Sequence, residues 1–150
     1  MELKDEILIN ASQEAVYSAL NDPEILKQCI PGCEELIKHS DTELEAKVVL
    51  KIGPVKAKFN GNVTLSGDAP PEKFSLIGYG NGGAAGYVKG GAVVVLEKKL
   101  DGVLLHYTAT ADIGGKLAQL GSRLVQGTAK KLATKFFESF ADLVSKNITN

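Results

Sequence analysis

The chain has 150 residues, of which 44% are hydrophobic and 23% charged, and its formal net charge is -1. This length suits one domain, over residues 1–150, that buries its core without disulfides or a structural metal. The near-zero charge, the absence of Trp and an aromatic content of only 6% argue against nucleic acid as a partner, because nucleic-acid binding needs basic surfaces and stacking side chains.

The sequence has no features of export or membrane insertion. Residues 1–5 lack the apolar run of a signal peptide, and no stretch approaches the roughly 20 apolar residues of a membrane helix. Cys29 and Cys33 are spaced C-x3-C with no second pair and no nearby His, which favours two free thiols over a zinc site. We therefore expect a soluble, cytoplasmic protein that needs no metal or cofactor.

The N-terminal third is predicted to hold one strand and two short helices. Residues 2–10 form the strand, and a helix runs from Ala11 or Ser12 to Leu20. A second helix begins at Asp22-Pro23, with Asp as N-cap and Pro in the first turn, and ends near residues 30–32.

The middle of the chain alternates apolar and polar residues with a period of two, which is typical of half-buried antiparallel strands. Asp101-Gly102 marks a hairpin turn between the last two strands. The predicted strands cover residues 43–51, 55–66, 73–80, 86–99 and 103–112.

From Lys116 to about Asn147, apolar residues recur at steps of three and four without a Pro, which predicts one long amphipathic helix. One helix covers only one face of a sheet, so the sheet must curl around it. The sequence therefore predicts an α+β fold in which a curved antiparallel sheet wraps a long C-terminal helix.

The inward-facing positions of the predicted strands are rich in small residues and carry no charge. Small residues on neighbouring strands leave space that a ligand can fill, whereas the alternative is that they let the long helix approach the sheet closely. On the final strand either His106 or Tyr107 faces inward. The small inward residues are Ala46, Ala57, Gly61, Gly78, Gly90, Ala92, Ala109 and Ala111.

Two patterns in the sequence suggest chemistry and are weighed here. Residues 78–83 match G-x-G-x-x-G, but predicted strands lie on both sides, so a hairpin loop beside a pocket mouth is favoured over dinucleotide binding. The acids near the predicted rim, Glu34, Asp68 and Asp112, have no spacing that forces two carboxylates together.

The long predicted helix carries five basic residues before its first acid, Glu138. A solvated helix face is one explanation, and a docking surface for anionic lipid headgroups or an acidic partner is the other. The basic residues are Lys116, Arg123, Lys130, Lys131 and Lys135.

Several segments along the whole chain resemble the carbon monoxide dehydrogenase CoxG family, within the START-like, Bet v 1-like helix-grip (SRPBCC) superfamily. The resemblance implies a strand, two helices, six strands and a long C-terminal helix that grips a hydrophobic cavity. It also implies a role in maturation, membrane recruitment or electron delivery for a molybdenum CO dehydrogenase. The segments that carry the resemblance are residues 10–17, 20–23, 30–34, 51–55, 59–61 and 114–123.

We expect an apolar small molecule, a lipid tail or an isoprenoid quinone, to bind in the cavity without catalysis, and Tyr107 to donate one orienting hydrogen bond. Further expected partners are a molybdenum hydroxylase-type enzyme and a membrane surface contacted through the basic helix face. The alternatives are a cyclase or hydrolase acting on an apolar substrate, and a protein-interaction chaperone without ligand. The predicted ligand-binding residues are Phe59, Gly61, Phe74, Gly90, Ala92, Tyr107, Leu117, Leu120, Gly121 and Leu124.

Overall fold

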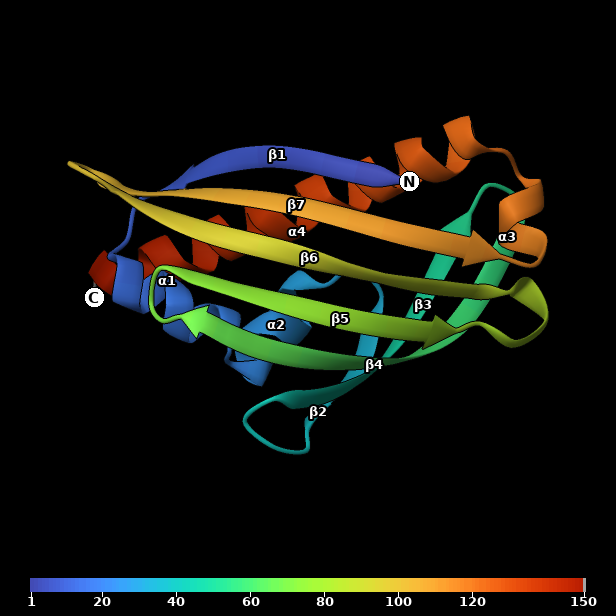
Figure 1. Ribbon diagram of the computed structural model, residues 1–150, viewed down its shortest axis with the longest axis horizontal. Helices are drawn as coiled ribbons and strands as arrows, with labels where there is room; N and C mark the ends of the chain where they lie inside the picture. The colour runs from blue at the N-terminus through green and yellow to red at the C-terminus, as the bar shows by residue number, and fades with distance from the viewer. Residues whose placement is uncertain (150) are drawn as a thin grey trace.

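The computed structural model describes residues 1–149, apart from the side chains of Asp68 and of residues 146–149. Seven strands form one antiparallel sheet in the order β1-β7-β6-β5-β4-β3-β2. Figure 1 shows this sheet curving in front of the helices. The strands are β1 (Glu2–Ile9), β2 (Cys33–Lys38), β3 (Glu43–Ile52), β4 (Val55–Ala69), β5 (Lys73–Asn81), β6 (Tyr87–Lys99) and β7 (Gly102–Gly114).

The helices α1, α2 and α4 lie on one side of the sheet, and α3 lies at the end of the sheet near the β3–β4 turn (Figure 1). The predicted α+β fold, a curved antiparallel sheet with a long C-terminal helix, is confirmed. The helices are α1 (Gln13–Leu20), α2 (Pro23–Cys29), the 3-10 turn η1 (Gly83–Ala85), α3 (Lys116–Gln119) and α4 (Ser122–Thr149).

Side-chain caps fix where the first two helices begin. The Ser12 hydroxyl accepts a 3.1 Å hydrogen bond from the Ala15 amide, and the Asp22 carboxylate accepts one of 2.9 Å from the Glu24 amide. Each cap satisfies an amide that has no partner inside its helix. The predicted starts of both helices are confirmed.

The period-two pattern assigned the faces of the long strands correctly. Leu44 pairs with Val63, and Val48 pairs with Phe59, across β3 and β4. Since register partners lie on the same face of a sheet, residues predicted to face inward on one strand meet inward residues of the next.

The alternation pattern did not predict strand β2. Its sequence, CEELIK, does not alternate, and the register slips between Cys33 and Glu35 where β2 pairs with β3. A short edge strand with a bulge has little buried surface to impose a pattern. With β2 included, six strands follow the two short helices, as the family resemblance implied.

The predicted single helix from Lys116 is in fact two helices. α3 ends at Gln119, and Gly121 has a φ of 95°, a left-handed conformation that glycine adopts far more readily than other residues. α4 then begins at Ser122. The predicted end of the helix, near Asn147, falls where the side chains are outside the described part of the chain.

The core has three clusters of buried residues, of which one, Leu26, Leu44 and Leu65, packs α2 against β3 and β4, and the other two lie at the two ends of the sheet. At one end, the second half of α4 buries Phe140 and Val144 against α1 and strands β1, β6 and β7. At the other end, Leu117 of α3 packs with Phe59 and Ala85. The region of the sheet between these two clusters holds the cavity described next.

Candidate functional site

The inward positions of β6 run from large to small and back to large along the strand. Val88 packs at the α3 end and Leu96 packs at the α1 end. Between them lie Gly90 and Ala92, which line a cavity. The two ends of the strand are therefore anchored in packed clusters while its centre leaves space.

The register places the small residues of neighbouring strands side by side. Gly78 of β5 pairs with Gly90 of β6, and Ala92 of β6 pairs with Ala109 of β7. On the other side of β5, Gly80 pairs with Gly61 of β4. A continuous floor of glycine and alanine thus crosses four strands at the centre of the concave face.

This floor belongs to a cavity of about 460 Å³, which is within the range of small-molecule sites. Strands β3 to β7 supply all of its lining except Ile30, which follows α2. The nineteen lining residues are Ile30, Ala46, Val48, Leu50, Ile52, Phe59, Gly61, Asn62, Val63, Leu76, Gly78, Tyr79, Gly80, Val88, Gly90, Gly91, Ala92, Ala109 and Thr110.

The chemistry of the lining is apolar. Asn62, Tyr79 and Thr110 alternate with the inward residues, so they contribute backbone to the wall while their side chains point outward. Among the described residues that line the cavity, none is Asp, Glu, His, Lys or Arg. The walls can exclude water and match a shape, but they offer no carboxylate or imidazole for proton transfer.

Four of the ten predicted ligand-binding residues line the cavity: Phe59, Gly61, Gly90 and Ala92. Phe59 is the only aromatic side chain that points into it from the described residues, and it is itself buried. The Phe59 ring also accounts for a glycine at position 82 in the β5–β6 loop. A Cβ at that position would lie 2.6 Å from Phe59 Cε1.

Two predicted residues, Phe74 and Tyr107, belong to the packed core instead. Phe74 meets Tyr17 edge to face at 5.7 Å between ring centroids, and Tyr107 stacks on Phe137 of α4 at 4.9 Å. Both rings are held by aromatic neighbours at the α1 end of the sheet. The lining of the cavity therefore gives no support to the predicted orienting hydrogen bond from Tyr107.

The four residues predicted from the C-terminal helix also lie elsewhere. Leu117 packs behind Phe59 in the α3 cluster, while Leu120, Gly121 and Leu124 line a groove on the surface of α4. The predicted helix is interrupted at Gly121, and α4 begins at Ser122. The first turns of α4 do not line the cavity. A larger side chain at Gly121 would therefore lie outside the cavity.

The cavity also has lining residues that the sequence analysis did not select. Most of them, including Val63, Leu76 and Val88, lie at inward-facing positions of the period-two alternation along the strands. Ile30 and Ile52 lie at the ends of predicted elements, where periodicity carries no directional information.

Tyr107, and not His106, faces inward on β7. Burial raises the pKa of Tyr107 above its ordinary value, and the nearby Asp5 carboxylate adds to the shift. His106 lies on the outer face, where its Nδ1 is 3.1 Å from Glu6 Oε2 and its Nε2 is 3.8 Å from Glu97 Oε2.

The G-x-G-x-x-G segment lies in the β5–β6 hairpin, as its flanking strands predicted. The 3-10 turn η1 begins at Gly83, the last residue of the segment, and buries Ala85 against the α3 cluster. No helix begins there to receive a phosphate, so the segment lacks the geometry of a dinucleotide site.

The remaining candidate groups are dispersed. Cys29 is buried and Cys33 is half-buried, both are free thiols, and burial is the main cause that raises each pKa. Glu34 lies 3.2 Å from Lys58 Nζ, whereas the side chain of Asp68 lies outside the described residues. Within the described part of the chain, no cluster of three metal-ligating side chains is present.

Four basic side chains, Arg123, Lys130, Lys131 and Lys135, are exposed along α4. In the portion of the chain that the structure describes, no helix is long and apolar enough to span a bilayer.

Comparison with known proteins identifies relatives along almost the entire chain. The family model for CoxG, the G subunit of carbon monoxide dehydrogenase, matches residues 6–145. No curated protein matches the sequence closely enough to count as a relative.

Among solved structures, a conserved protein from Geobacillus kaustophilus is 32% identical with a TM-score of 0.90, and the match covers 97% of this chain and 96% of that one. A protein from Thermus thermophilus is 17% identical with a TM-score of 0.74, covering 96% and 97% of the two chains. Ara h 8.0201 is 12% identical with a TM-score of 0.66, covering 100% and 99%.

The last two likenesses concern the fold alone, which is the Bet v 1-like helix-grip fold. The family match covers nearly all of the sheet and most of α4. The chain belongs to the carbon monoxide dehydrogenase CoxG family.

Proposed function

We propose that this protein binds an apolar small molecule in the cavity of the concave sheet face, with a lipid tail or an isoprenoid quinone as the leading class. The observation that carries the proposal is the run of small residues at the centre of the sheet between two packed ends. Closely packed interiors leave few voids larger than a water molecule, and an apolar concavity of about 460 Å³ is filled most favourably by an apolar guest.

Burial of hydrocarbon would supply most of the affinity. Each buried CH₂ contributes about 0.8 kcal/mol, so ten of them would contribute roughly 8 kcal/mol before the cost of association. Because the described lining has no acid or base, we favour binding over a cyclase or hydrolase activity.

Native mass spectrometry of the purified protein, followed by solvent extraction and reconstitution with a short-chain isoprenoid quinone or a fatty acid, tests the proposal. We expect an apolar adduct that extraction removes and the added probe restores at a stoichiometry of one. A protein that carries no adduct and takes up neither probe would contradict the proposal.

We further propose that the protein acts as a carrier, maturation or membrane-recruitment factor for a molybdenum CO dehydrogenase-type enzyme in the cytoplasm. The family membership supports this role. Affinity purification from cells that express such an enzyme tests it, with retention of the enzyme expected. Loss of the enzyme at the first wash would argue against this role while leaving ligand binding untouched.

Peripheral membrane contact through the basic face of α4 is the third part of the proposal. Arg123, Lys130, Lys131 and Lys135 are exposed and pair with no acid among the described residues. Each basic residue near an anionic surface contributes about 1 kcal/mol, and salt screens the attraction.

Co-sedimentation with phosphatidylcholine vesicles, with and without phosphatidylglycerol, tests the membrane contact. We expect binding only to the anionic vesicles and its loss in Lys130→Glu/Lys131→Glu. The matched control, Lys51→Glu/Lys56→Glu, removes two lysines that pair across β3 and β4 and should bind normally. Equal losses in the two variants would refute a specific role for α4.

A further inference from the structure

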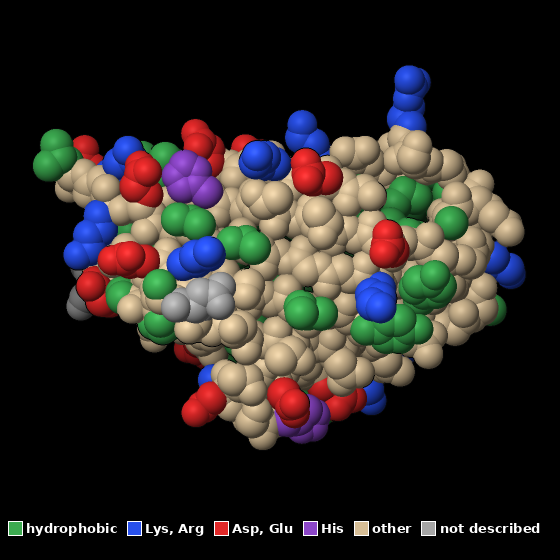
Figure 2. Space-filling view, viewed as in Figure 1, with side chains coloured by type: hydrophobic (Ala, Val, Ile, Leu, Met, Phe, Trp, Pro, Cys, Tyr) green, Lys and Arg blue, Asp and Glu red, His purple; other side chains and the backbone are tan. Residues whose placement is uncertain are grey.

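The convex face of the sheet exposes large apolar side chains on the adjacent strands β5 and β6, away from the cavity and the helices. The most exposed of them, Ile77, is 69% accessible, and Figure 2 shows apolar and basic side chains near one another on this side of the molecule. Contiguous exposed apolar side chains are typical of interaction surfaces. The outer apolar face is defined here by Ile77, Tyr79, Tyr87, Val93 and Val95.

Two tyrosine rings of this face hold one another in place. The rings of Tyr79 and Tyr87 stack with their centroids 6.0 Å apart and an angle of 19° between their planes. The Tyr87 ring also rests on Gly114 of β7, where a Cβ would lie 2.2 Å from Tyr87 Cε1. Rings that are ordered before binding lose little entropy on binding, and tyrosine is enriched among the residues that dominate protein–protein affinity.

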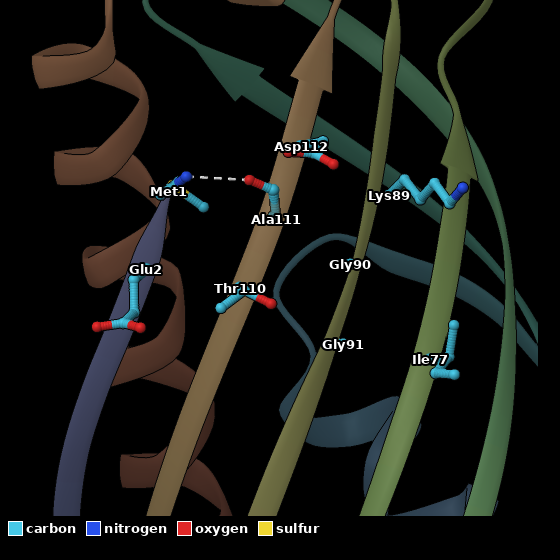
Figure 3. A pocket seen from close by; sticks show the side chains of 9 residues that line it. All are labelled: Met1, Glu2, Ile77, Lys89, Gly90, Gly91, Thr110, Ala111 and Asp112. Atoms are coloured by element: carbon cyan, nitrogen blue, oxygen red, sulfur yellow. Dashed lines mark hydrogen bonds between the residues drawn. The ribbon is translucent and has the colours of Figure 1, made fainter.

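A hollow of about 500 Å³ lies beside Ile77 on the same face. Figure 3 shows the bare backbone of Gly91 as its floor, between Ile77 of β5 and Thr110 of β7. Lys89 of β6 also lines the hollow, and its side chain extends over β5 (Figure 3). The hollow can therefore receive an apolar side chain that has a carboxylate beside it.

Basic side chains surround the outer apolar face. Among the outward side chains that the structure describes on β4, β5 and β6, five belong to lysines, and Glu97 is the one acid. The other outward acids lie toward the opposite edge of the sheet, with Asp112 on β7 and Glu2 and Glu6 on β1. The five lysines are Lys56, Lys58, Lys73, Lys89 and Lys99.

Three of these lysines can meet a partner's acids. Lys56, Lys73 and Lys89 form no ion pair with the described residues, whereas the other two do. Exposed ammonium groups around an apolar patch attract an acidic surface and repel a basic one. The charge of this part of the sheet therefore selects an acidic partner and disfavours a second copy of the same face.

From these observations we infer that the outer apolar face docks a protein surface on which carboxylates surround an apolar side chain. The partner is the molybdenum CO dehydrogenase-type enzyme of the proposed function, on which this inference rests. The apolar side chain enters the hollow beside Ile77, and a carboxylate meets the Lys89 ammonium. A lipid surface is a poorer match, because the Tyr87 ring lies against Gly114 and does not project into a bilayer.

The size of the face suits a transient complex. Four strands about 4.8 Å apart, each with about eight residues, present roughly 500 Å² in plan. The two partners together would then bury roughly 1,000 Å², which is typical of transient complexes. Association of this kind depends on electrostatic attraction, so added salt should weaken it.

The outer apolar face and the basic face of α4 lie on opposite sides of the molecule. Figure 1 shows α4 behind the sheet. The apolar side of α4 packs toward the sheet through Phe136 and Phe140, so its exposed basic side chains face away from the sheet. A chain that contacts a membrane through α4 can therefore hold the enzyme on its other side, which supports membrane recruitment among the proposed roles.

Biolayer interferometry of the full chain against the immobilised, purified enzyme tests the docking face. Ile77→Asp should weaken binding at least tenfold, because burial of one such side chain accounts for more than one factor of ten. Lys73→Glu/Lys89→Glu should also weaken it at least tenfold at low salt, and the loss should shrink as salt is added.

The matched control is Leu8→Asp. Leu8 is 58% exposed on the same side of the sheet, but it lies on β1, outside the outer apolar face. This variant should bind the enzyme like the unmodified chain. Circular dichroism and uptake of a fluorescent fatty acid should show that every variant is folded and keeps its cavity.

Co-sedimentation with phosphatidylcholine–phosphatidylglycerol vesicles separates the two faces. The unmodified chain should carry the enzyme into the pellet, Ile77→Asp should sediment without the enzyme, and Lys130→Glu/Lys131→Glu should bind the enzyme but leave it in the supernatant. Equal affinity of the unmodified chain and Ile77→Asp for the enzyme would overturn the docking face and leave the proposed role intact.

An unmodified chain that does not bind the enzyme would overturn both the proposed role and the docking face, whereas uptake of the fatty acid would still support ligand binding. Loss of vesicle binding in Ile77→Asp would assign the outer apolar face to lipid. Self-association of the unmodified chain that Ile77→Asp abolishes would assign it to a second copy. Either result would overturn the inference.

Discussion

Gly78 on β5 and Gly90 on β6 are register partners that both line the cavity, yet they tolerate a side chain differently. A Cβ on Gly78 would lie 3.5 Å from Val63 Cγ2, which is an ordinary contact. A Cβ on Gly90 would lie 2.2 Å from the Thr110 carbonyl oxygen, which no backbone accommodates without moving. Position 78 can therefore be used to fill the cavity, whereas position 90 is required by the sheet.

Gly78→Leu is predicted to reduce ligand binding at least tenfold while leaving the chain folded. The added side chain occupies the centre of the cavity and removes space that several methylene groups would fill. Titration with a fluorescent fatty acid measures the effect. Gly127→Leu is the control, because a Cβ there meets nothing within 4 Å, and it should bind like the unmodified chain.

Gly90→Ala is predicted to destabilise the protein by more than about 1 kcal/mol, since backbone collisions are among the costly classes of substitution. Urea denaturation measures the free energy of unfolding. Gly78→Ala serves as the comparison and should cost less than Gly90→Ala. Equal costs at the two positions would show that the close approach to Thr110 is unimportant.

A series of ligands of increasing alkyl length is predicted to bind about fourfold more tightly per added CH₂, which is the factor that 0.8 kcal/mol represents. The gain should stop when the cavity is full. Isothermal titration calorimetry gives each dissociation constant. Affinity that does not change with chain length would indicate recognition of a polar headgroup.

The two glycines at the start of the C-terminal helix are predicted to respond in opposite ways to alanine. Gly127 lies inside α4 with open space around its Cβ position, so Gly127→Ala should stabilise the fold by about 1 kcal/mol. Gly121 has a φ of 95°, so Gly121→Ala should destabilise it by roughly 1–2 kcal/mol. Thermal denaturation of both variants measures the difference, and stabilisation by Gly121→Ala would mean that the helix break is not retained in solution.

Tyr107 is predicted to make stability fall at high pH. Its folded pKa is raised by burial and then by Asp5, so the unfolded chain releases the proton first. The stabilising contribution is complete below the unfolded value of about 10 and is lost as the pH rises through the folded pKa. The free energy of unfolding measured from pH 9 upward should fall less steeply in Tyr107→Phe than in the unmodified chain, and identical slopes would exclude this role.

Much of the fold was predictable because burial imposes a period of two on long strands. Residues such as Val48 and Phe59, which pair across β3 and β4, could be assigned to one face from the sequence alone. The caps at Ser12 and Asp22 likewise depend on local chemistry. Strand β2 was missed because a short, irregular edge strand buries too little to show a pattern.

The helix break was missed for a different reason. Leu117, Leu120 and Leu124 keep helical spacing across Gly121, although that residue leaves the helical conformation. The assumption of one continuous helix then placed Leu120 and Leu124 over the cavity, whereas they line the surface groove of α4. The φ angle at Gly121 marks where the predicted single helix breaks, and periodicity does not report it.

The most direct test of the central proposal is methyl NMR of the protein during titration with a short-chain isoprenoid quinone. The proposal predicts shifts concentrated on the inward methyl groups of Val63, Leu76 and Val88, which line the cavity. The methyl groups of Val93 and Val95, which are exposed on the convex face, should stay unchanged. Shifts confined to the convex face, or no shifts up to the solubility of the quinone, would contradict binding in the cavity.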